Sequence, residues 1–152
     1  DENIIVGERS GTTFISPNRE FPIFEPSVTT GNRVPTNVFF EFTTQPQWER
    51  TDRRWSTLLI GVGDVRIENQ DSRPRVQARL ENRTLLPIAD IEVVATLYDV
   101  NNNAITASQT FVPQLAGSGT QSVVFTWPQP LSRRAVRVEV IPRINIFSEA
   151  NQ

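Results

Sequence analysis

The clearest hydrophobic pattern in the chain is an alternation over residues 93–98, where Val, Ala and Leu fall on one side of an extended backbone. This period of two predicts a strand with one face in a core. Asp99 ends the strand, and Asn101–Asn103 supplies residues that tolerate the left-handed conformation of a tight hairpin. A second strand is predicted to begin at Ala104.

The same alternation recurs through the second two-thirds of the chain, separated by Pro, Gly, Asn and Ser turns. An opening strand is predicted over Trp55–Val62, with Gly61 and Gly63 closing it. Four further stretches follow, at Asp64–Asn69, Val76–Leu80, Ser122–Trp127 and Val136–Val140. Several short strands joined by such turns predict an all-β fold, an antiparallel β-sandwich.

The beginning of the chain carries weaker β patterns, and they align with the end of the chain as a repeat. The predicted strands there are Ile4–Val6, Thr12–Ile15, Phe21–Pro26 and Val38–Phe42. In this alignment Asp1 falls where Asp99 falls, so the first copy is expected to lack its opening half. The predicted division is a partial or strand-complemented related β unit over 1–48, a linker over 49–54, a complete sandwich over 55–148 and a tail over 149–152.

Four motifs together resemble the FxLYD-type immunoglobulin-like domain. They are V-x-A-x-L-x-N-x-T over Val76–Thr84, V-x-A-x-L-Y-D over Val93–Asp99, Leu115–Gly117 and Val123–Phe125. The sequence departs from the family at Ala95, where a Phe is usual, and at Ala78, where a Gly is usual. The resemblance implies a small antiparallel sandwich in an exported, often membrane-anchored, bacterial or archaeal envelope protein. It implies no catalytic residues.

Composition narrows the function classes. The 17 acidic and 15 basic residues give a formal charge of −2, too balanced to favour a nucleic-acid partner. The absence of Met leads us to expect a trimmed or excised chain, and no apolar run is long enough to span a bilayer. We therefore expect an exported protein at the cell surface or in the periplasm, with an anchor or signal peptide that could have preceded Asp1.

Little conventional chemistry is present. With no Cys and no His, nucleophilic triads built on them are excluded and zinc sites are disfavoured, and no cofactor is expected. Asp99–Asn103 begins like a calcium loop, but it lacks the Gly and the bidentate Glu such a loop needs, so a hairpin turn is favoured. Asn82–Thr84 is a formal glycosylation acceptor, for which a structural role is favoured. Acidic side chains that could pair in a glycosidase cleft are read as solvated: Asp64, Glu68, Asp71, Glu81, Glu92 and Glu139.

Aromatic residues gather near the junction of the two predicted units, and they form the candidate interaction residues: Phe39, Trp48 and Trp55, with Arg53 and Arg54 beside them. Phe39 and Phe40 point to opposite faces of a strand, so both cannot lie in one ordinary core. Packing between units is the simpler interpretation. The alternative is an exposed platform for a glycan or a protein.

The sequence thus predicts a non-enzymatic, structural or adhesive segment of an envelope protein, with a carbohydrate-binding module as the alternative. An incomplete first unit would expose open edges and an apolar face, which proteins rarely leave uncovered. Strands from another copy or another envelope protein are therefore expected to complete it. The candidate assembly residues are Ile4, Val6, Phe14, Phe21 and Phe24.

Overall fold

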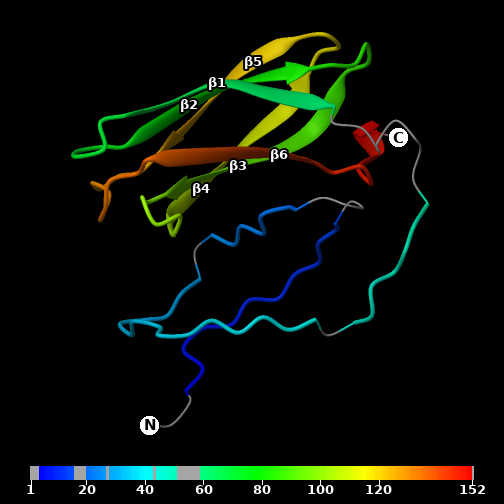
Figure 1. The fold of residues 1–152 in the computed structure, drawn as a ribbon. Coiled ribbons are helices and arrows are strands. Elements are labelled where there is room, and N and C mark those ends of the chain that lie inside the picture. Colours follow the sequence, from blue (N-terminus) through cyan, green and yellow to red (C-terminus); the bar gives the residue numbers. More distant parts are fainter. Residues whose placement is uncertain (1–3, 16–19, 27, 43, 51–58, 152) are drawn as a thin grey trace.

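The computed structural model describes residues 4–15, 20–26, 28–42, 44–50 and 59–151. Six strands form two antiparallel three-stranded sheets that face each other (Figure 1). The strands are β1 (Ile60–Glu68), β2 (Arg75–Asn82), β3 (Ile88–Tyr98), β4 (Ala104–Leu115), β5 (Thr120–Thr126) and β6 (Arg137–Ile144). A short 3₁₀ turn, η2, follows at Glu149–Asn151.

The strand order is β1-β2-β5 in one sheet and β4-β3-β6 in the other. The hairpins β1–β2 and β3–β4 stay within a sheet, whereas the chain crosses between sheets after β2, after β4 and again after β5. This Greek-key arrangement is that of an immunoglobulin-like sandwich, in which β6 is the last strand among the described residues. The predicted fold class, an all-β antiparallel sandwich, is confirmed.

Strand β3 forms the centre of the core. Its inward residues Ile91, Val93, Ala95 and Leu97 are fully buried, and the facing sheet contributes Phe125 among others. The alternation that the sequence shows over residues 93–98 therefore marks the core face of a central strand.

The hairpin after β3 forms where it was predicted. Asn102 adopts a left-handed conformation with φ of 62°, and β4 begins at Ala104. The short polar side chain of Asn tolerates this conformation better than most residues.

The opening strand differs from the prediction. β1 runs without interruption from Ile60 to Glu68, so Gly61 and Gly63 lie inside the strand and do not close it. A Cβ on Gly61 would come within 2.6 Å of the Arg83 guanidinium, so the glycine makes room for that side chain. The register with β2 shifts between Gly63 and Arg66, and Asp64 has φ of 52°, which marks a β-bulge at this edge strand.

The described residues before β1, which we call the N-terminal arm, form no strand. The strands predicted at Ile4–Val6, Thr12–Ile15, Phe21–Pro26 and Val38–Phe42 are therefore wrong for this chain by itself. An alternating pattern makes a strand only when a neighbouring backbone pairs with it, and Pro22 and Pro26 remove two N–H donors from the third of these segments. The assignment of 1–48 as half of a β repeat, of 49–54 as a linker and of 149–152 as a tail stays a prediction.

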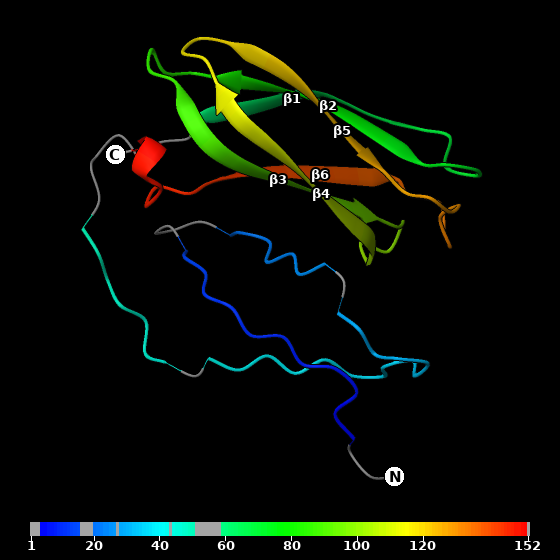
Figure 2. The same ribbon diagram turned by 180° about the vertical axis from the view of Figure 1, so that it is seen from behind.

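The arm runs back and forth beside the outer face of the sheet β4-β3-β6, with residues 20–26 nearest to it in both views (Figures 1 and 2).

Residues 149–151 fold back onto the sandwich. The Asn151 side chain accepts a hydrogen bond from the Ala89 N–H at 2.9 Å and donates to the Ala89 carbonyl at 2.8 Å. It thereby pairs with the backbone at the start of β3 as a strand would.

Asn82, at the end of β2, joins three loops at one end of the sandwich. Its buried Nδ2 donates to the carbonyls of Leu86, Leu115 and Ala116 at 2.8, 3.2 and 3.0 Å. Its Oδ1 accepts hydrogen bonds from the Thr84 N–H at 2.9 Å and the Thr84 hydroxyl at 2.8 Å. The amide thus satisfies backbone groups that the turn between sheets leaves unpaired.

We expect Asn82→Ala to lower the free energy of unfolding by about 3 kcal/mol, because it leaves buried carbonyls and an N–H without partners. Urea unfolding followed by circular dichroism measures this. Asn101→Ala, on an exposed turn, is the matched control and should change stability by less than about 0.5 kcal/mol. A loss of similar size in both variants would show that Asn82 has no special role.

Candidate functional site

The Asp99 carboxylate, at the start of the possible calcium loop, is bound by the protein itself. Its Oδ1 accepts hydrogen bonds from the N–H groups of Asn101 and Asn103, both at 2.9 Å, and Arg133 lies 3.2 Å from its Oδ2. No cluster of three possible metal ligands occurs among the described residues. These contacts support the hairpin interpretation.

The same contacts alter the ionisation of two neighbouring residues. The backbone N–H of Asn103, more than any other group, holds the pKa of the Asp99 carboxyl below its usual value, and Arg133 adds to this effect. Burial raises the pKa of the Tyr98 hydroxyl, which also donates a hydrogen bond to Glu139 at 2.9 Å. Both groups therefore keep their usual charge at neutral pH, Asp99 as the carboxylate and Tyr98 as the neutral phenol.

Asn82 heads the formal glycosylation motif, but its Nδ2 is buried and fully used in hydrogen bonds. A glycan is attached at this atom, so the folded sandwich does not offer it. The structural role that the sequence favoured fits this geometry.

Most of the candidate carboxylates pair with arginines on the outer faces of the sheets. Four ion pairs join Asp64 to Arg79 at 2.7 Å, Glu81 to Arg83 at 3.6 Å, Glu92 to Arg143 at 3.5 Å and Glu139 to Arg137 at 3.7 Å. Glu68 and Asp71 are exposed. Each ion-paired carboxylate thus faces a cation, and none of the four faces a second carboxylate as a glycosidase pair would.

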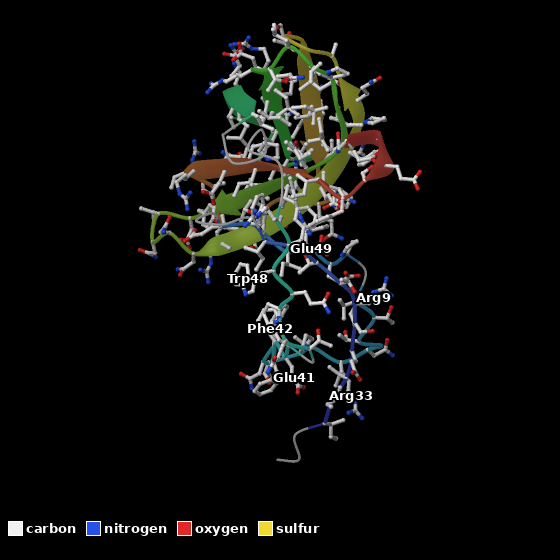
Figure 3. All side chains as sticks on the ribbon, turned by 90° about the vertical axis from the view of Figure 1, so that its right-hand side faces the viewer. Arg9, Arg33, Glu41, Phe42, Trp48 and Glu49 are labelled. Atoms are coloured by element: carbon white, nitrogen blue, oxygen red, sulfur yellow. The ribbon has the colours of Figure 1, made fainter. Side chains whose placement is uncertain are left out.

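The aromatic candidates do not gather into a platform within the described part of the chain. Phe39 and Trp48 are each 86% exposed, and the only aromatic pair in this stretch joins Phe40 to Phe42 edge to face at 5.2 Å. Figure 3 shows Phe42 and Glu41 well away from the sandwich. Trp55, Arg53 and Arg54 lie outside the described residues.

The arm contacts the sandwich at Arg143, a residue that the sequence did not single out. The Arg143 guanidinium lies over the Phe14 ring at 4.4 Å, donates a hydrogen bond to the Thr13 hydroxyl and pairs with Glu92. Phe14 also meets Phe147 edge to face at 5.8 Å. A largely buried arginine on the outer face of a sheet indicates such a covering segment, although a sequence does not reveal which segment covers it.

The other predicted assembly residues lie along the same arm. Val6, Phe21 and Phe24 are half-buried, whereas Ile4 is exposed. Within the arm, Arg9 pairs with Glu25 at 2.7 Å and joins two of its extended segments. Of the five candidates, only Phe14 has a specific ring contact with the sandwich among the described residues.

The two long sides of the sandwich differ in how well they are closed. On one side β4 turns directly into β5 (Figure 2), and Val112, Val123 and Phe125 are buried there, whereas Ile105 and Trp127 are half-buried. On the other side β1 of one sheet lies next to β6 of the other, which we call the β1/β6 side (Figure 1). Ile60 at the start of β1 is buried, but several core-facing residues along this side are only half-buried: Val62, Ile67, Val138, Val140 and Ile144.

The outer edge of β6 carries unpaired backbone groups. The Asn145 N–H donates to the Asp90 carbonyl, next to β3. In an antiparallel pair, every second residue of a strand directs its N–H and C=O groups toward the partner strand. The residues of β6 that bond to β3 are therefore Arg137, Glu139, Ile141 and Arg143. The N–H groups of Val138, Val140 and Ile144 then point away from β3, and no described residue bonds to them. Pro142 occupies one of these outward positions, so its lack of an N–H removes no hydrogen bond between β6 and β3.

No protein-family model matches the chain, and no curated protein matches it by sequence. A crystal structure of a DUF1425 family member from Shewanella sp. pv-4 is similar with a TM-score of 0.43 and 20% identity, covering 55% of this chain and 76% of that chain. A glycoside hydrolase family 2 β-glucuronidase is similar with a TM-score of 0.35 and 13% identity, covering 54% of this chain and 11% of that chain. The FxLYD resemblance stays a prediction.

We expect Asp99→Asn to make the free energy of unfolding depend less on pH in the acid range. The pKa of Asp99 in the folded protein lies below the unfolded value of about 3.9, so the carboxylate stabilises the fold fully above that pH. This contribution is lost as pH falls through the folded pKa. The variant should be less stable than the wild type at neutral pH, with the difference narrowing in acid. Urea unfolding across this range measures it, and parallel pH profiles would contradict the assignment.

Proposed function

We propose that the chain is a non-enzymatic structural segment of an exported cell-envelope protein, and that it assembles through strand complementation. The observation that carries this proposal is the coexistence of a well-packed sandwich with an arm of exposed, strand-like sequence. A strand-like segment without a backbone partner and a sheet edge without a strand are the two halves of a β-augmentation contact.

The arm supports an assembling role because its apolar side chains have no core to enter. Six large hydrophobic residues in its second half stand mainly in solvent: Val34, Val38, Phe39, Phe40, Phe42 and Trp48. Contiguous exposed apolar residues are uncommon in soluble domains unless they meet a partner. The arm is therefore the part of the chain best suited to contact another protein.

The non-enzymatic role is supported by the arrangement of the charged groups. The four ion-paired candidate carboxylates bond to arginines across sheet faces, and Asp99 is committed to its own turn. Catalysis usually needs titratable groups that converge on a concave site. Export is supported by the resemblance to the FxLYD-type domain. Separately, no helix in the described part of the chain is long and apolar enough to span a membrane.

Carbohydrate binding, the alternative drawn from the sequence, stays a prediction. Phe39 and Trp48 are exposed as it requires, but no ring contact brings them together in the described part of the chain. A protein partner suits an extended apolar segment better than a sugar does, because strand pairing uses the whole backbone.

We expect the full chain to self-associate reversibly. Sedimentation equilibrium between about 1 µM and 1 mM should show a weight-average mass that rises above the monomer mass of 17.2 kDa. An association constant that does not change with salt concentration would agree with apolar and backbone contacts, because ion pairs weaken as salt rises. A mass that stays at 17.2 kDa over the whole range would contradict assembly through copies of this chain.

A further inference from the structure

The β1/β6 side combines two features that an added strand would use. It has outward N–H groups on β6 and core-facing apolar side chains that remain half-covered. β5 also has an outer edge, but its core-facing Val123 and Phe125 are already buried. An added strand would therefore bury apolar surface beside β6 and much less beside β5.

Residues 38–42 of the arm have the pattern that such a strand needs. Val38, Phe40 and Phe42 share one side of an extended chain, and the contact between the Phe40 and Phe42 rings at 5.2 Å shows that they already lie together. Phe39 and Glu41 fall on the opposite side. Five residues span about 17 Å, which fits along the roughly 27 Å of an eight-residue strand such as β6.

A strand paired with β6 would have one side-chain face toward the core and one outward. Val38, Phe40 and Phe42 would face the core and cover Val138 and Val140, whereas Phe39 and Glu41 would face outward, as Arg137, Glu139 and Arg143 of β6 do.

We propose that residues 38–42 of one copy add as a strand to the outer edge of β6 in a second copy. This proposal rests on the proposed function and names its contact. The occupant is a second copy because no described residue of the same chain covers either the segment or the edge, and the arm is held on the outer sheet face through Phe14 and Arg143. Residues 43–59 could extend about 60 Å, so closure within one chain is a distinct outcome of the test.

The experiment uses two full-chain variants that each remove one half of the contact. Val140→Pro deletes an N–H that faces away from β3, so the fold should persist while the edge can no longer accept a strand. Phe40→Asn removes the central apolar side chain of the donor. Each variant by itself should associate at least about tenfold more weakly than the wild type. Mixed together they should form a one-to-one dimer, because the first still donates and the second still accepts.

Matched controls lie on the chain itself. The Trp127 N–H donates to the Pro74 carbonyl, so by alternation along β5 the Val124 N–H points away from β2. Val124→Pro therefore removes an N–H from the outer edge of β5, and it should leave association unchanged. Phe39→Asn alters the opposite side of the donor segment and should change association by no more than about threefold. Thermal unfolding by circular dichroism checks that each variant is folded.

The outcomes separate the two proposals. Association that survives Val140→Pro, or that is lost equally in Val124→Pro, would overturn the edge assignment while assembly stands. A wild type that stays monomeric would overturn both the assembly and the edge assignment. This holds whether the edge of β6 is unpaired or is paired with residues 38–42 of the same chain. If Val140→Pro does not fold, a synthetic peptide of residues 36–44 decides. It should shift the amide resonances of Val138, Val140 and Ile144 in the wild type, and shifts confined to β5 would overturn the assignment.

Discussion

Two three-stranded sheets have four edge strands, and each edge carries N–H and C=O groups that no strand of its own sheet can satisfy. The chain closes one side by turning β4 directly into β5, so that Val112 and Phe125 are buried there. On the opposite side, β1 and β6 are the first and last strands among the described residues, and no turn joins them directly. Partial burial of Val138 and Val140 follows from this connectivity.

The N-terminal arm lies on the same sheet as the open edge but covers its face rather than its edge. Arg143 connects the two, since its side chain stands on the outer face of β6, pairs with Glu92 and lies against Phe14. The arm thus has an anchored first part and a second part whose Val38 and Phe39 are almost fully exposed. This division keeps a strand-like segment near the sandwich without using it in the core, and it gives the proposed assembly both of its components.

The sequence was informative where structure depends on neighbours along the chain. The period of two around Val93 located the central strand, and the Asn-rich turn located its hairpin, because both are local patterns. The same pattern over Val38–Phe42 predicted a strand that this chain does not form, since pairing requires a distant backbone. The contact of Arg143 with Phe14 and the loops joined by Asn82 also depend on distant residues, so no local pattern reveals them. Pro142 within an alternating stretch was a usable sign that β6 is an edge strand.

The central claim is that the edge of β6 is open in the single chain. Residue-resolved amide hydrogen exchange tests it most directly, at a concentration where the chain is monomeric. The N–H groups of Val138, Val140 and Ile144 should exchange at least about tenfold faster than those of Glu139, Ile141 and Arg143, which bond to β3. Equal protection of the two sets would show that a strand already covers this edge, and would contradict the account.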